Sequence, residues 1–217
     1  MLKLLFVVNC LFLINFAFSQ RCDVIDTIST SGKSTFFKTI SKKEYLSKKD
    51  SSLPLTNENA LKKTNGFYSL NLNERVIVLR DTLEEDNPLY AHYEYVGVYP
   101  NIGLLYFSVS YYESGATLLI NQHTGNSVEF FGEPILSPNG TLMFNASQIM
   151  NYDVIPNIIQ IWSIENGQIK LLIEYDLDDD WIPENIKWID EKTIFFIRKF
   201  EDNSTVYAMI DVMDLLR

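Results

Sequence analysis

The chain has 217 residues, of which 47% are hydrophobic, and its formal net charge is -10 at pH 7. This length is enough for one domain with a sizeable core. The charge is uneven, because residues 21–65 carry nine Lys or Arg against five Asp or Glu, whereas residues 66–217 carry eight against 23. The acidic part argues against a nucleic-acid partner, since affinity for phosphate depends on clustered Lys and Arg. Its acidity either keeps the protein soluble or attracts a cationic partner.

Residues 1–19 have the three parts of a secretory signal peptide. Lys3 supplies the positive start, residues 4–18 are almost wholly apolar, and Ala17-Phe18-Ser19 provides small residues for cleavage. An uncleaved anchor is the less favoured alternative, because a membrane span needs about 20 apolar residues and no such cleavage site. We expect an exported protein, periplasmic or extracellular, with no transmembrane segment after cleavage.

Residues 20–65 lack strand alternation and are rich in Ser, Thr and Lys. One weak apolar stripe at helical spacing, between Ser34 and Lys49, is broken by the run that ends at Pro54. We therefore predict a basic, loosely structured or loosely docked N-terminal arm at 20–65. Residues 66–217 are predicted to form one all-β domain.

Short alternating runs separated by turn residues predict strands throughout this domain. Leu105, Phe107 and Val109 share one strand face, whereas Tyr106 and Ser108 lie on the other. Such alternation is typical of antiparallel strands with one face in water. The strands expected in chain order are 67–72, 75–80, 90–99, 104–112, 116–121, 127–131, 134–137, 142–146, 158–164, 168–175, 185–189, 193–199 and 205–210.

The pattern also repeats along the chain. The turn glycines Gly125 and Gly167 are 42 residues apart, close to the roughly 40 to 45 residues of a four-stranded propeller blade. A third repeat near the end lacks a fourth strand, which the hairpin predicted at 67–80 could supply. We predict an antiparallel meander of about three propeller-like blades, closed or open, with a β-sandwich as the alternative.

Two stretches carry a resemblance to a known family. Ser137-Pro138-Asn139-Gly140, followed by a strand, resembles the Ser-Pro-Asp-Gly turn of WD-like and periplasmic β-propeller repeats. Trp162 stands near the tryptophan of such a blade, although Asn139 replaces the usual aspartate. The chain is also similar to small exported bacterial proteins of unassigned function, in a pattern made of Tyr95-Val96-Gly97, Tyr111-Tyr112-Glu113-Ser114-Gly115, Thr124-Gly125 and Ser137-Pro138-Asn139-Gly140. This resemblance implies a scaffold rather than a particular activity.

Three aspartates form a candidate metal site. Asp176, Asp178 and Asp180 have the one, three, five spacing of a calcium loop. The loop is incomplete, because Trp181 stands at position six, which needs Gly, and Lys187 at position twelve, which needs Glu. A looser calcium site and a solvated connection between strands are both open interpretations.

Aromatic residues form a candidate binding surface. Tyr112 and Glu113 are the proposed contacts to a sugar or peptide, since Tyr combines stacking area with a polar tip. Hydrolytic chemistry has little support, because neither His92 nor His123 has a serine or cysteine partner in any known motif. The first hypothesis is an exported, non-enzymatic protein that presents an acidic, aromatic surface to a cationic protein or other macromolecule. The alternatives are a glycan-directed lectin or hydrolase with paired carboxylates, and a calcium-stabilised module.

Overall fold

The structure, a computed structural model, describes residues 37–57, 60–73, 75–82, 90–112, 114–147, 157–177 and 181–216. These residues form antiparallel sheets with two short helices, which confirms that the fold is all-β and antiparallel. None of the helices in this part of the chain has the length and apolar character of a membrane span. The elements are β1 (Lys38–Thr39), α1 (Lys42–Ser47), β2 (Phe67–Asn71), β3 (Val76–Arg80), β4 (Ala91–Tyr99), β5 (Leu104–Tyr111), β6 (Gly115–Asn121), β7 (Ser127–Phe130), β8 (Ile135–Leu136), β9 (Leu142–Ala146), β10 (Ile158–Glu165), β11 (Gln168–Asp176), β12 (Trp181–Trp188), β13 (Thr193–Phe200), β14 (Thr205–Asp211) and α2 (Val212–Leu215).

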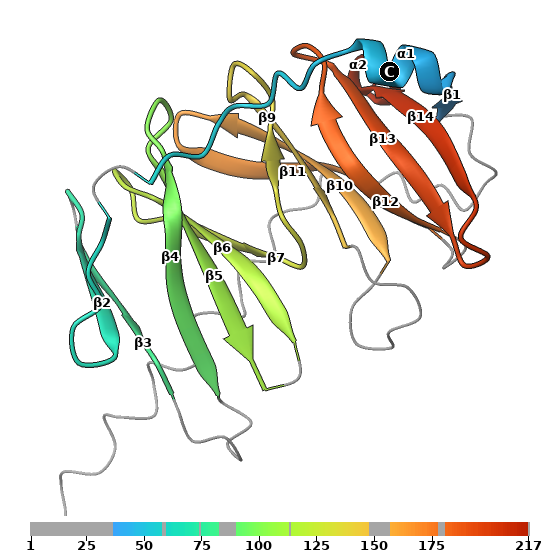
Figure 1. Cartoon of the computed structure of the whole chain (residues 1–217). Helices are drawn as coiled ribbons and strands as arrows, with labels where there is room; N and C mark the ends of the chain where they lie inside the picture. Colours follow the sequence, from blue (N-terminus) through green and yellow to red (C-terminus); the bar gives the residue numbers. More distant parts are fainter. Residues whose placement is uncertain are drawn as a thin grey trace, which may run out of the picture.

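Three of the sheets have four strands, and the fourth is the β2–β3 hairpin. Strands β4 to β7 and β8 to β11 each form a meander in chain order. The last sheet has the order β1-β14-β13-β12, so its outer strand comes from the N-terminal segment. Figure 1 shows the sheets following one another from the hairpin at one end to β12, β13 and β14 at the other.

The fourth strand of the last sheet corrects a hypothesis drawn from the sequence. We expected the hairpin at 67–80 to complete that sheet, but β1 does so, with Lys38 opposite Met209 and Thr39 opposite Ala208. The hairpin instead packs its buried side chains Tyr68, Leu70 and Leu79 against the sheet of β4 to β7. A two-residue strand has no readable alternation, which is why the pattern missed it.

The two glycine turns are confirmed. Asn166 and Gly167 both have positive φ, 51° and 75°, between β10 and β11. Two positive φ values match the twist of a tight hairpin, and Asn-Gly is the favoured pair for them. Gly125, with φ of 70°, occupies the turn between β6 and β7.

The sheets stack face to face and enclose three apolar clusters. One lies between the hairpin and β4 to β7, the second between β4 to β7 and β8 to β11, and the third between β8 to β11 and the last sheet. Both faces of the two middle sheets are therefore largely covered. Tyr106, expected on a wet face, is only 7% exposed, because the neighbouring sheet packs over part of that face.

The N-terminal segment, residues 37–57, contacts an edge strand of all three four-stranded sheets. Ser51, Leu53 and Thr56 donate backbone N–H groups to carbonyls of the edge strands β12, β8 and β4, at 2.8, 3.0 and 3.0 Å. Figure 1 shows this segment running from α1 past the sheets toward β4. Near its start, Phe37 packs edge-on against Trp181 and other aromatic rings. These contacts are not those of a loosely docked arm, whereas residues 20–36 lie outside the described part of the chain.

Candidate functional site

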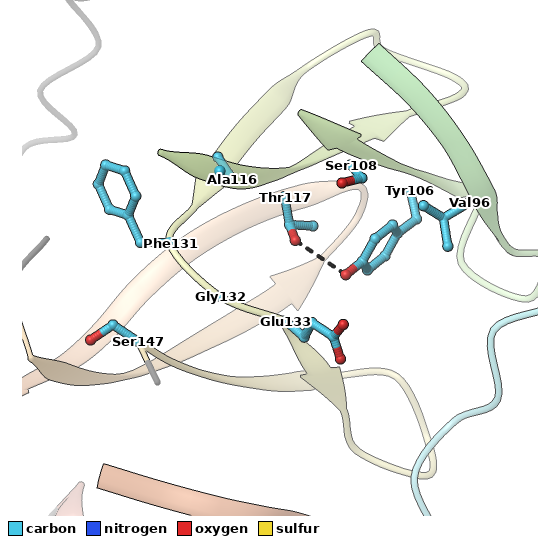
Figure 2. A pocket seen from close by; sticks show the side chains of 10 residues that line it. Val96, Tyr106, Ser108, Ala116, Thr117, Phe131, Gly132, Glu133 and Ser147 are labelled. Carbon is cyan, nitrogen blue, oxygen red and sulfur yellow. Dashed lines mark hydrogen bonds between the residues drawn. The ribbon is translucent and has the colours of Figure 1, made fainter. Parts of the chain in front are cut away.

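A pocket of about 510 Å³ opens between the sheet of β4 to β7 and the sheet of β8 to β11 (Figure 2). Strands β4, β5 and β6 form one wall, and the connection after β7, together with Ser147 after β9, forms the other. The lining residues are Val96, Tyr106, Ser108, Gly115, Ala116, Thr117, Phe131, Gly132, Glu133 and Ser147.

The pocket is hollow because small residues face it. Ser108 lies directly opposite Thr117 across β5 and β6, and Gly115 begins β6 on the same face. Alternation along β6 turns Gly115 and Thr117 toward this side of the sheet. These positions lack the large side chains that elsewhere fill the space between two sheets.

Gly132 lets the opposite wall approach β9. Its φ is 126°, a conformation that residues with a side chain rarely adopt. A Cβ there would also overlap the carbonyl oxygen of Ala146. Glycine is therefore required at this point of the wall.

A buried hydroxyl pair lies deep in the pocket. The Tyr106 hydroxyl and Thr117 Oγ1 are 3.1 Å apart and hydrogen bonded. Burial raises the pKa of Tyr106, the hydrogen bond with Thr117 lowers it, and the charge of Glu133 raises it, with a net increase. Tyr106 therefore stays neutral near pH 7, where its hydroxyl serves as a hydrogen-bonding group rather than a general base.

The mouth of the pocket combines apolar surface with a carboxylate. Val96 is 38% exposed and Phe131 is 39% exposed, and Glu133 is also exposed. Figure 2 shows the side chains of Tyr106, Thr117 and Glu133 on one side of the pocket, with Phe131 and Ser147 on the other. The pocket can therefore offer polar and apolar contacts to one ligand.

Next to Gly132, one polar atom of the neighbouring sheet has no partner. Asn145 is 1% exposed and donates to Gln160 Oε1 at 3.1 Å, and Gln160 in turn donates to Glu174 at 2.7 Å. Asn145 Oδ1 accepts no hydrogen bond from any residue that the structure describes. Buried polar groups are normally paired, so this acceptor is an exception, and Asn145 is not among the described residues that line the pocket.

Of the binding and metal residues expected from the sequence, the two that the structure describes, Tyr112 and Asp176, do not line this pocket. Tyr112 is 60% exposed and follows the end of β5, and Asp176 ends β11. Glu113, Asp178 and Asp180 lie outside the described residues. Within the described ranges, no group of three or more metal-ligating His, Cys, Asp or Glu occurs. The calcium site and the contact at Tyr112 and Glu113 stay predictions.

The sequence reasoning missed most of the pocket. Tyr106 was recognised as part of an aromatic, alternating strand, but Ser108, Thr117 and Glu133 carry no motif. The available signal was the polar face of β5, where Tyr106 and Ser108 alternate with apolar residues. Whether this polar face lines a pocket depends on which sheet packs against it. The sequence pattern does not give the order in which the sheets stack.

A second polar cluster, also missed, lies near the hairpin. The Asp81 carboxylate, 4% exposed, accepts from Lys63 Nζ at 2.7 Å and from the Tyr93 N–H at 3.0 Å, and lies 3.1 Å from His92 Nδ1. Burial alone raises the pKa of Asp81, but these hydrogen bonds and neighbouring charges outweigh it and lower the pKa overall. The cluster joins the end of the N-terminal segment to β3 and β4.

No family model, curated protein or solved structure matches this chain. The pocket and its chemistry must therefore be interpreted from the geometry of this chain.

Proposed function

We propose that this chain is an exported, non-enzymatic binding protein. Its ligand site is the pocket between the sheet of β4 to β7 and the sheet of β8 to β11. One observation carries the proposal: the hydroxyl pair of Tyr106 and Thr117 lies in a pocket whose mouth holds an exposed carboxylate and an exposed aromatic ring. A concave site with apolar walls and a few polar groups is the usual form of a ligand site. The ligand belongs to a macromolecular partner, either a cationic protein or a glycan.

Binding is favoured over hydrolysis by the acids present. Glu133 is the one carboxylate among the described residues that line the pocket. Most glycoside hydrolases need two carboxylates flanking the scissile bond. A lectin is the second candidate, because the Phe131 ring offers a stacking surface and the hydroxyls of Ser108 and Tyr106 offer hydrogen bonds.

The proposal includes an open, propeller-like scaffold of the kind found in WD-like repeats. Each four-stranded sheet would correspond to a blade, and β1 would complete the last one. The turn at Ser137 to Gly140 supports the comparison, since Asn139 Oδ1 accepts from the hydroxyls of Ser137 and Thr141, both at 2.8 Å. Asn139 thus makes hydrogen bonds that an aspartate would make in the same turn.

The ligand site is tested by filling the pocket. Gly115 has no strained φ, and a Cβ there makes only an ordinary contact, 3.6 Å from the Val109 carbonyl oxygen. Gly115→Trp should fill the pocket without breaking the sheet, and Gly115→Ala is its matched control. Wild type and both variants would be applied to panels of immobilised glycans and synthetic peptides.

We expect wild type and Gly115→Ala to retain the same ligands and Gly115→Trp to lose them. If Gly115→Trp folds normally and keeps every ligand, or wild type binds nothing in either panel, the pocket is not the functional site. Circular dichroism would establish that the variants fold.

A further inference from the structure

We propose that the pocket receives the cationic end of a lysine or arginine side chain from a partner protein. This inference rests on the proposed function and specifies the chemistry of its ligand. It follows from the charge, the hydrogen-bonding groups and the apolar walls of the pocket.

The segment of the chain that lines the pocket contains the negative charge of Glu133 but no lysine or arginine. The described residues that line the pocket fall between Val96 and Ser147, and the sequence has no Lys or Arg between Arg80 and Lys170. Glu133 forms no ion pair with any residue in the described ranges. A ligand cation would pair with this exposed carboxylate at the mouth of the pocket and give it the counter-charge that the described residues do not supply.

The polar groups of the pocket are suited to a donor. The hydroxyls of Tyr106 and Thr117 share one hydrogen bond, so lone pairs remain on both oxygens, and Ser108 adds a third hydroxyl. An ammonium group has three donors and no acceptor, and a guanidinium has five donors and no acceptor. Both cations can therefore donate to these oxygens and to the Glu133 carboxylate.

The apolar walls suit the stem of such a side chain. Val96 and Phe131 line the pocket beside the polar groups. Long cationic side chains bury their methylene groups against apolar surface and keep the charged end on a polar group. An aromatic ring such as that of Phe131 adds attraction for a cation near its face. A sugar would also stack on this ring, but it would leave the Glu133 charge uncompensated.

The size of the pocket indicates a side chain presented by a polypeptide. Its volume of about 510 Å³ lies within the roughly 300 to 1,000 Å³ of ordinary ligand pockets. A single lysine or arginine side chain leaves part of this space free. Neighbouring residues of the same segment would occupy the remainder, so a short peptide should bind more tightly than a free alkylamine.

The test uses the full chain and two synthetic peptides of equal length, one with lysine in an alanine and serine background and one with the same lysine Nε-acetylated. Binding would be measured by calorimetry for wild type, Glu133→Gln, Glu191→Gln and Gly115→Trp. Glu191 is exposed in the turn between β12 and β13 of the last sheet. Its substitution removes the same charge outside the pocket and is the matched control.

We expect the lysine peptide to bind wild type and Glu191→Gln equally, and Glu133→Gln about tenfold more weakly, because only Glu133 pairs with the bound cation. Added salt should weaken binding to wild type more than binding to Glu133→Gln. The acetylated peptide should bind at least tenfold more weakly than the lysine peptide, since acetylation removes the charge. A free alkylamine should bind more weakly than the peptide.

Equal binding of the two peptides, or equal affinity of Glu133→Gln and Glu191→Gln, would overturn the inference. If Gly115→Trp still abolished binding of a neutral peptide or glycan, the pocket would remain a ligand site and only its cation preference would be wrong. If Gly115→Trp had no effect on any ligand, the proposed function would fail as well.

Discussion

The two interfaces on either side of the β8 to β11 sheet differ in how they are filled. On the side of the last sheet, Trp188 and Phe196 are fully buried and Trp181 stacks on Phe196 with ring centroids 5.9 Å apart. On the side of β4 to β7, Phe130 packs edge-on against Trp162 at 5.2 Å, but Ser108 and Thr117 leave the pocket open. The same antiparallel architecture therefore produces one closed interface and one partly open interface.

This difference shows that side-chain volume, rather than strand topology, determines where a site can form. Both interfaces are built from four-stranded sheets with similar pairing. A cavity forfeits dispersion contacts that a packed core would make. The open interface offsets part of that loss in two ways. Tyr106 and Thr117 form a hydrogen bond, and an apolar cluster packs between the same two sheets beside the pocket.

The largest effect is expected at Trp188 in the filled interface. Trp188→Ala should lower the free energy of unfolding by about 3 to 5 kcal/mol, because it removes a buried ring and leaves a cavity. Trp188 Nε1 also donates to the Ile135 carbonyl at 2.9 Å and so ties β12 to β8. Trp188→Phe keeps most of the ring and should cost clearly less. Urea denaturation measures both, and equal losses would contradict the importance of ring volume in this interface.

An intermediate effect is expected at the wall of the open interface. Gly132→Ala should lower the free energy of unfolding by roughly 1 to 3 kcal/mol, because of its positive φ and the overlap with the Ala146 carbonyl oxygen. Gly115→Ala, in the opposite wall, should change stability by less than about 0.5 kcal/mol. Thermal melting of both variants is the measurement, and a destabilised Gly115→Ala would show that the pocket walls are less tolerant than the geometry implies.

The strands could be predicted from the sequence because each has its own local pattern. The alternation at Leu105 and Phe107 and the Asn166-Gly167 turn involve residues close together in the chain. Strand β1 could not be predicted, since two residues carry no period and their partners, Ala208 and Met209, are some 170 positions away. Burial of both faces of the middle sheets could not be predicted either. It depends on the packing of another sheet, whose residues are distant in the sequence.

The candidate site was beyond sequence reasoning for a related physical reason. Glu133 lies in a connection with no motif, and it lines the same pocket as Tyr106 only because the connection after β7 folds next to the face of β5. Asp81 and Lys63 likewise meet across 18 residues of chain. The aspartates and tyrosines predicted to form sites are close together in the sequence. The pocket residues are far apart in the sequence and come together only in the folded chain.

The smallest effect is expected from removing the hydroxyl that Tyr106 contacts. Thr117→Val should lower the free energy of unfolding by about 1 kcal/mol, since a buried hydroxyl loses its hydrogen bond while the side-chain volume is nearly unchanged. Thr117→Ser keeps the hydroxyl and should keep the hydrogen bond. In urea denaturation, only Thr117→Val should therefore show the loss of unfolding free energy that comes from this bond. If Thr117→Val were instead more stable than wild type, the open interface would behave as an ordinary apolar core. The hydroxyl pair would then be retained at a cost to stability, which favours a role in ligand binding over a role in folding.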